Sequence, residues 1–405
     1  MIRYLCVLLL CAVAQAQELP QLIDQALRGN REILAAQKRY EAARQRAPQE
    51  RSLPDPVVSL GYTSVGGPYP VAGIGREVAA NAGVMVSQEF PFPGKRELRG
   101  SIAEKEADAE FEQYRAVRLN VVARITTAYH ELHHAMVGIG QTRRYQELLS
   151  NILKIAEARY SVGRAAQQDI FKAQTQYSIF AAQLERYEQE RATRTIEINA
   201  LLNRPQDTPV TVPEDIPVGE LTATLDELLA RSRTAPVLAR QMKLTQTSEL
   251  AENLARKNRL PDYTLSGGYF NQGLMPPMWQ FRVDLRIPAR AGAKEAEVTE
   301  RALQAGEARH NYEAAGVTVE AQVRENYTVA ATARKLVDLY SKSVIPEAQL
   351  ALESSMTSYE TGAVDFLPVF SNFMNVVEYQ LMYHEEIMQF HLALARLEEL
   401  TGGAL

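Results

Sequence analysis

The sequence predicts a mainly α-helical protein with a small β part, built from two copies of one subdomain. Three observations lead to this fold class. Residues 51–62 and 258–269 share a Leu-Pro-Asp motif followed by Ser-x-Gly-Tyr. Each copy precedes a very long run with apolar residues three and four positions apart, the spacing of packed helices. Each copy also contains a pair of short strand-like segments. A repeat this long indicates duplication of a whole subdomain rather than a solenoid.

The first residues predict secretion. Residues 1–16 contain the basic Arg3, an apolar run and the small-residue cleavage site 14–16, which together are typical of a signal peptide. Cys6 and Cys11 are the only cysteines, and both lie in this segment. The mature chain is therefore expected to have no disulfide, no catalytic thiol and no thiolate metal site.

Composition excludes several classes of protein. The chain of 405 residues has a formal net charge of −5, which gives no reason to expect nucleic acid as a partner. After the signal peptide no apolar run reaches the length of a membrane-spanning helix. No nucleotide-binding loop is present either. The chain is therefore not expected to draw energy from nucleotide hydrolysis. We also expect no enzymatic activity and no cofactor.

The helical runs predict an antiparallel column. Residues 95–160 contain no proline, and residues 293–359 contain only Pro346. At about 1.5 Å per residue each run would be roughly 100 Å long, the length of coiled coils rather than of globular helices. Shorter helical stretches match these runs when stacked end to end, and they are residues 18–52, 167–203, 222–258 and 365–400. We therefore expect two long and four short helices.

The domain boundaries follow from the duplication. The first repeat covers residues 17–205 and the second covers residues 222–405. Between them, residues 206–221 form a proline-rich connector that cannot continue a helix. We expect this connector to lie outside the helical column at mid-height.

The strand-like segments form two predicted hairpins, residues 57–64 with 83–90 and residues 263–271 with 279–287. In the last of these, apolar residues from Trp279 to Ile287 alternate with charged and polar ones. Such a strand can face hydrocarbon on one side and water on the other, although a half-buried soluble hairpin shows the same alternation. Four strands are too few to close a membrane barrel, so other copies of the chain would have to complete it.

Together these features resemble the TolC family of outer-membrane efflux factors over essentially the whole mature chain. The resemblance implies a homotrimer, in which each protomer adds four strands to a 12-stranded barrel in outer-membrane lipid. The helices would form a hollow barrel that extends into the periplasm. It also implies a passive exit duct of a tripartite efflux system, served by an inner-membrane pump through a periplasmic adaptor protein. Residues 88–96, where a strand meets a long helix, are similar to the same junction in family members that work with heavy-metal pumps of the resistance-nodulation-division class. This similarity suggests heavy-metal cations as cargo.

The resemblance also assigns the two helical tips, residues 160–164 and 359–363, to adaptor docking. Each contains a Tyr-x-x-Gly break, and glycine permits the tight reversal of a helical hairpin. A bare turn without a partner is the alternative. The residues implied in docking are Tyr160, Val162, Gly163, Arg164, Tyr359, Thr361, Gly362 and Ala363.

The acidic gate of better-known family members is not carried over. Those members have acidic residues six and nine positions beyond the second-tip glycine, where this chain has Pro368 and Ser371. Asp365 lies nearby, and Asp169 occupies the six-place position in the first repeat. We expect these two carboxylates at the channel mouth, where they could select cations.

One motif favours a rival function. Residues 130–134, His-Glu-Leu-His-His, satisfy the H-E-x-x-H pattern of zinc metalloproteases. The motif lies in the middle of a very long predicted helix, without the usual extension or third ligand. We therefore predict no metal site and no catalysis here, and His384 and His391 are expected to be packed or solvated. A structural coiled-coil protein of the cell envelope is the other alternative, and extraction behaviour would separate it from a membrane barrel.

Overall fold

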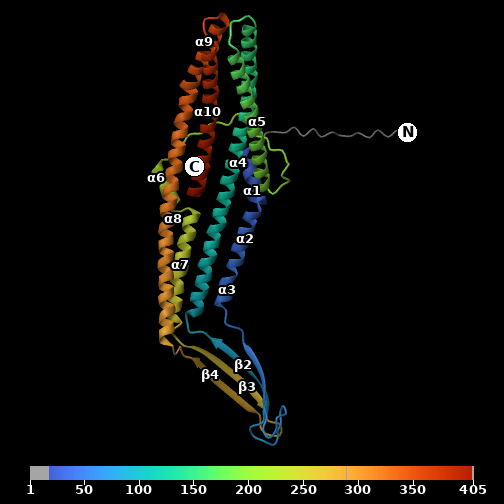
Figure 1. Cartoon of the computed structure of the whole chain (residues 1–405). Helices are drawn as coiled ribbons and strands as arrows, with labels where there is room; N and C mark the ends of the chain where they lie inside the picture. Colours follow the sequence, from blue (N-terminus) through green and yellow to red (C-terminus); the bar gives the residue numbers. More distant parts are fainter. Residues whose placement is uncertain (1–17, 289, 404–405) are drawn as a thin grey trace, which may run out of the picture. The chain divides into compact units, whose positions relative to one another are not determined.

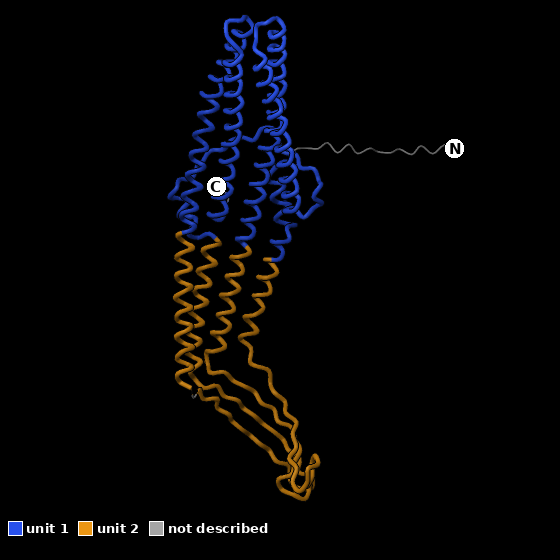
Figure 2. Tube along the Cα trace, in the orientation of Figure 1, with its two compact units in different colours: residues 1–35, 115–235, 318–405 blue, residues 36–114, 236–317 orange. Residues whose placement is uncertain are grey.

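A computed structural model describes residues 18–288 and 290–403, which are mainly helical with one four-stranded antiparallel sheet (Figure 1). The predicted signal peptide, residues 1–16, lies outside the described residues. Two compact units are present, and each draws on both sequence repeats (Figure 2). Unit 1 comprises the described residues of 1–35, 115–235 and 318–405, and unit 2 comprises 36–114 and 236–317.

Unit 2 consists of helices and the whole sheet. Its helices are most of α2 (Arg31–Arg44), α3 (Arg46–Arg51), α7 (Pro236–Lys257) and the first parts of α4 (Lys95–Ser161) and α8 (Ala291–Leu339). The strands are β1 (Val57–Thr63), β2 (Asn81–Phe90), β3 (Asp262–Asn271) and β4 (Met278–Arg286), in the order β1-β2-β3-β4. The four predicted strands are thus confirmed, and the structure adds that β2 pairs directly with β3.

The sheet has one apolar face and one polar face. Leu60 lies opposite Val84, which lies opposite Tyr269, so one apolar row crosses three strands. On the other face Ser87 and Ser266 are opposite each other, with their hydroxyl oxygens 2.9 Å apart. Leu60 and Phe281, one on each outer strand, are both 83% exposed. The alternation seen in the sequence therefore extends over the whole sheet and leaves an apolar face uncovered within this unit.

A buried ion pair joins the start of α4 to the start of β3. Lys95 is 2% exposed, and its Nζ lies 2.8 Å from Asp262 Oδ1 and 2.8 Å from the Leu260 carbonyl oxygen. Asp262 Oδ1 also accepts a hydrogen bond from the Phe92 backbone N–H at 2.7 Å. Because a buried ammonium needs a charged partner and hydrogen-bond acceptors, Lys95 fixes the loop before α4 against the Leu-Pro-Asp motif of the second repeat.

Unit 1 holds the remaining helices. They are α1 (Leu19–Gly29), the later part of α4, α5 (Gln167–Leu201), α6 (Leu225–Ser232), the end of α8, a π-helix at Tyr340–Val344, α9 (Ile345–Thr361) and α10 (Phe366–Thr401). A core of aromatic and aliphatic side chains lies between α4, α5, α9 and α10, with Phe180 and Phe373 fully buried at its centre. None of the helices in the described residues combines the length and the apolar character needed to cross a membrane.

Three predicted helices are interrupted, each for a local reason. The predicted helix 18–52 breaks at Asn30, whose Oδ1 accepts hydrogen bonds from the backbone of Glu32 and Ile33 and so caps α2. The predicted helix 222–258 breaks before Pro236, because the residue preceding a proline disfavours helical geometry. In the second long run, a π-helical turn precedes Pro346, which has no N–H to donate.

We predict that replacing Lys95 by methionine destabilises the protein by about 1–3 kcal/mol, because the partly buried Asp262 carboxylate would lose its charged partner. The double variant K95M/D262L removes both charges and should recover much of this loss. Thermal unfolding of the purified protein, followed by circular dichroism, measures both effects.

Lys38→Met is the matched control. Lys38 forms an ion pair with Glu41 on the surface of α2, where its side chain is 75% exposed. Its loss should change stability by less than about 1 kcal/mol. Equal effects of the Lys95 and Lys38 variants would contradict the structural role of the buried pair.

Candidate functional site

The two predicted tips end their helices in the same way. In the first, Gly163 has φ +74°, its N–H donates to the Tyr160 carbonyl at 2.9 Å, and the Arg164 N–H donates to the Arg159 carbonyl at 2.8 Å. In the second, Gly362 has φ +84°, with matching bonds to the carbonyls of Tyr359 and Ser358 at 3.0 and 2.8 Å. Both are Schellman caps, in which a left-handed residue satisfies the last carbonyls of a helix. The glycines therefore supply a backbone geometry that other residues resist.

A cation–π contact joins the two tips. The Arg159 guanidinium of α4 lies 4.2 Å from the centroid of the Tyr359 ring on α9. The Tyr359 ring also packs edge-on against Phe366, the first residue of α10. Such a contact contributes about 0.5–1 kcal/mol or more where it is shielded from water. Arg159 thus ties the first tip to the second, and Figure 1 shows the two turns side by side at one end of unit 1.

The predicted docking residues divide into an exposed set and one buried anchor. Tyr160 is 45% exposed and Val162 is 67% exposed, whereas Tyr359 is only 3% exposed. Tyr359 is therefore positioned to support the surface from beneath rather than to present its ring to a partner. The remaining predicted residues are all exposed, and they are Gly163, Arg164, Thr361, Gly362 and Ala363.

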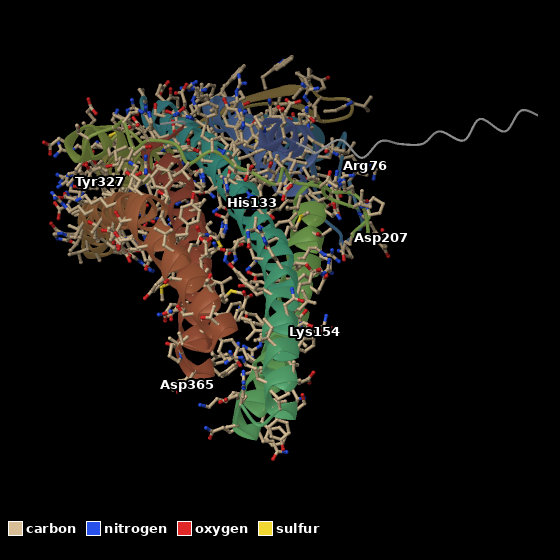
Figure 3. All side chains as sticks on the ribbon, turned by 90° about the horizontal axis from the view of Figure 1, so that it is seen from above. Arg76, His133, Lys154, Asp207, Tyr327 and Asp365 are labelled. Carbon is tan, nitrogen blue, oxygen red and sulfur yellow. The ribbon has the colours of Figure 1, made fainter. Side chains whose placement is uncertain are left out.

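The two predicted acidic residues lie at the starts of the returning helices. Asp169 is in the first turn of α5, and Asp365 is the residue before α10, labelled in Figure 3. A carboxylate is stabilised at a helix N-terminus by the helix dipole. Burial raises the pKa of the Tyr359 phenol; Arg159 opposes the rise, while Asp169 and Asp365 both add to it. Both carboxylates thus act electrostatically on the same phenol.

Sequence reasoning missed Arg159. It lies next to the Tyr-x-x-Gly motif but outside it, and no spacing in the sequence marks it. The only available signal is a basic residue one position before the motif in the first repeat, where the second repeat has Ser358. Its role depends on the two tips meeting in space, which neither tip shows alone.

The histidine motif does not form a metal site among the described residues. His130 stacks on His391 of α10 with ring centroids 4.0 Å apart and an interplanar angle of 3°. Glu131 lies 3.1 Å from the Arg194 guanidinium. His134 Nε2 lies 3.4 Å from Glu385. The two histidines and the glutamate of the motif therefore have three different partners, which is the geometry of packing rather than of zinc chemistry.

The third histidine of the motif contacts the connector. His133 Nε2 lies 2.9 Å from the Glu214 carbonyl oxygen, and Figure 3 labels His133 on α4. The connector continues to Val218 and Leu221, which pack beside Phe390. Asn199 anchors its start by donating hydrogen bonds to the carbonyls of Gln206 and Thr208 at 2.9 and 2.8 Å. Polar bonds and a small apolar contact thus hold a segment that has no regular structure.

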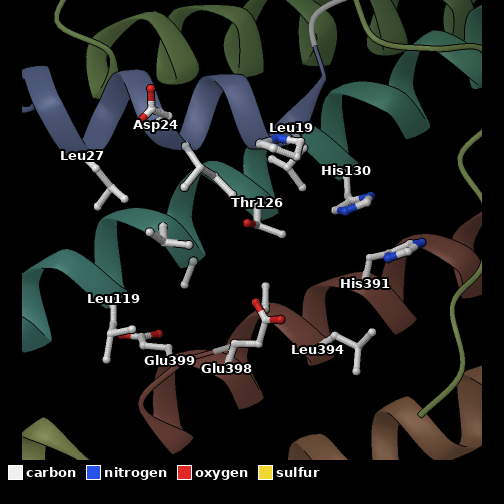
Figure 4. A pocket seen from close by; sticks show the side chains of 16 residues that line it. Leu19, Asp24, Leu27, Leu119, Thr126, His130, His391, Leu394, Glu398 and Glu399 are labelled. Carbon is white, nitrogen blue, oxygen red and sulfur yellow. The ribbon is translucent and has the colours of Figure 1, made fainter. Parts of the chain in front are cut away.

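The stacked histidines line one side of a cavity of about 560 Å³ between α1, α4 and α10 (Figure 4). Apolar side chains such as Leu19, Leu27 and Leu119 form much of the wall. Burial lowers the pKa of His130 to about 2, and His391 and His133 add to this effect. Burial also lowers the pKa of His391 to about 4, with a smaller contribution from His133. Both rings are therefore neutral in the folded protein near neutral pH.

Comparisons with known proteins match this fold. A family model described as outer membrane efflux protein matches residues 22–204, which include the first tip. The outer membrane protein TolC of Vibrio cholerae is 23% identical over 380 residues, covering 87% of this chain and 83% of that protein.

Solved structures of outer-membrane proteins share the fold over nearly the whole chain. The structure of CusC has a TM-score of 0.81 at 16% identity and covers 96% of this chain and 93% of its own. The outer membrane protein VceC from Vibrio cholerae has a TM-score of 0.81 at 18% identity, with coverage of 95% and 96%. The MtrE outer membrane channel of Neisseria gonorrhoeae has a TM-score of 0.77 at 19% identity, with coverage of 96% and 89%.

We predict that acid weakens the protein through the stacked histidines. Unfolded histidine has a pKa of about 6.5, so below that pH the unfolded chain takes up protons that the folded His130 and His391 do not accept. Stability is therefore full above about pH 6.5 and falls as the pH decreases toward the folded values. In thermal unfolding, the melting temperature should drop by several degrees between about pH 7.5 and about pH 5.5.

The double variant H130F/H391F keeps two stacked rings and removes both titrations, so its melting temperature should depend less on pH. His310→Phe is the control, because His310 is exposed and forms its ion pair with its near neighbour Glu313. An unchanged pH dependence in the double variant would contradict the role of the stacked pair.

Proposed function

We propose that this chain, a TolC-like outer-membrane efflux channel, is the exit duct of a tripartite efflux system. Channels of this kind are non-enzymatic pores of the outer membrane that extend into the periplasm. The observation that carries the proposal is the pairing of an exposed apolar sheet face with two exposed helical tips in one chain. A structural coiled-coil protein would need neither feature.

The sheet supports a role in lipid. Trp279, Phe281 and Val283 alternate with polar residues along β4, and each of the three is more than 60% exposed. Such a face stays in water only at a large hydrophobic cost. Family channels are trimeric, and three copies of a four-stranded sheet would close a barrel without open edges.

The tips support docking of a periplasmic adaptor. Tyr160 and Val162 are exposed at a hydrogen-bonded cap, and exposed aromatic and apolar residues are suited to contact a protein partner. Arg159 and Tyr359 hold the second tip beside the first. We propose that the adaptor contacts both tips together and that an inner-membrane pump delivers the substrate through it.

Heavy-metal cations are the proposed cargo. The support is the sequence of residues 88–96 and the position of two carboxylates, Asp169 and Asp365, beside the tips. Carboxylates at a pore mouth attract cations without binding them tightly. The test is growth on graded concentrations of copper, silver, zinc and organic toxins in cells that express this chain as their only duct with its pump and adaptor. Protection against organic compounds alone would contradict the metal cargo.

We predict that the double variant G163L/G362L loses adaptor capture and resistance while the trimer still reaches the outer membrane. Leucine at a positive φ costs roughly 1 kcal/mol or more at each cap. At Gly163 this cost comes from the backbone conformation alone, because an added β-carbon would have no other atom within 4 Å. Pull-down of the adaptor and trimer content of outer-membrane fractions measure the two effects.

Gly140→Leu is the matched control. Gly140 lies within α4, is exposed, and has open space around its missing β-carbon. This variant should keep both trimer and resistance. Full resistance in the tip variant would show that the tips are not the docking surface.

A further inference from the structure

The duplication fixes which strand positions of the two hairpins correspond. Asp55 and Asp262 occupy the same place in the repeated Leu-Pro-Asp motif, so Val57 corresponds to Thr264. Val57 pairs with Ser87, and Thr264 pairs with Asp284. Ser87 of β2 therefore corresponds to Asp284 of β4. The sequence repeat and the observed hairpin registers together give an equivalent in one repeat for every strand residue of the other.

The contact between β2 and β3 is the junction between the two repeats within one chain. There Val86 lies opposite Gly267, and Val84 lies opposite Tyr269. The other possible junction of the same kind joins β4 of one protomer to β1 of the next. Replacing each residue by its repeat equivalent converts these two pairs into Val283 opposite Leu60 and Phe281 opposite Tyr62. Strand directions agree, because alternation through β1-β2-β3-β4 leaves β4 antiparallel to a following β1.

We propose, building on the trimer of the proposed function, that β4 and β1 of neighbouring protomers pair antiparallel in this register. The proposed occupant of each free strand edge is thus a second copy of this chain. The central pair is Leu60 of one protomer with Val283 of the partner subunit. Phe281 and Leu285 of the partner subunit then lie opposite Tyr62 and Val58.

The side chains support this register independently of the repeat. Leu60, Val58 and Tyr62 are 83%, 62% and 56% exposed, and they lie on the apolar face of the sheet. Val283, Leu285 and Phe281 lie on that same face and are 63%, 61% and 83% exposed. A slip of one residue would place these apolar residues against the polar face. A slip of two would keep the faces but break the equivalence between the two junctions.

The aspartates of the two Leu-Pro-Asp motifs differ in their partners. Asp262 at the internal junction receives Lys95. Asp55, its repeat equivalent beside β1, is exposed and forms no ion pair within the part of the chain that the structure describes. The ion pair thus belongs to the internal junction alone, and the proposed register rests on the repeat equivalence and on the apolar face of the sheet.

Disulfide trapping tests the register. The background is clean because Cys6 and Cys11, the only cysteines of the sequence, both lie in the predicted signal peptide. Directly opposite residues have Cα atoms about 4.5–5.5 Å apart, within disulfide range, whereas diagonal neighbours are about 7–8 Å apart. The variant L60C/V283C should therefore give covalent dimers and trimers on a non-reducing gel after mild oxidation of outer-membrane fractions. The slipped variants L60C/F281C and L60C/L285C should give several-fold less.

Two further measurements separate the possible failures. The variant S87C/S266C joins directly opposite residues within one chain and should form an intramolecular disulfide, which shows that oxidation works. The mass of the detergent-solubilised wild-type protein reports the trimer itself. A trimer that crosslinks best through a slipped pair, or through none of the three pairs, overturns the register and leaves the duct intact. A monomer overturns the proposed function.

Discussion

The backbone of an edge strand must find hydrogen-bond partners, and this constraint governs the sheet of this protein. Within the described residues β1 and β4 pair on one side only, while their apolar side chains remain exposed. In hydrocarbon an unpaired strand edge costs several kcal/mol for each free group. In the proposed membrane barrel, neighbouring protomers would complete the sheet. The Lys95–Asp262 pair secures the β2–β3 junction, which lies within one chain.

The tips show how duplication produces a composite surface. Each repeat supplies a helix ending with the same backbone cap and a left-handed glycine. The caps are equivalent, but the contact between them is not symmetric, because Arg159 of the first repeat packs on Tyr359 of the second. One tip thus presents exposed Tyr160 while the other buries its tyrosine as an anchor. A partner would meet two similar turns whose side chains have diverged.

The histidines illustrate the difference between a motif and a site. A chemical pattern on one helix can hold a metal only if other elements complete the ligand set. Here α10 offers His391 to His130 as a stacking partner, and α5 and α10 offer Arg194 and Glu385 to the other motif residues. These contacts make the motif part of the packing in unit 1. They also keep two histidines neutral, so acid favours the unfolded chain, whose histidines accept protons.

The sequence by itself determined the helical class, the duplication, the four strands and the glycine reversals, because each depends on local periodicity or on one residue's backbone freedom. It did not reveal the breaks at Asn30 and before Pro236, where a local cap or a proline overrides a long apolar stripe. The β2–β3 pairing, the partners of the histidine motif and the contact of Arg159 with Tyr359 were decided only by tertiary structure. Each of these joins residues far apart in the chain, so no local pattern encodes it.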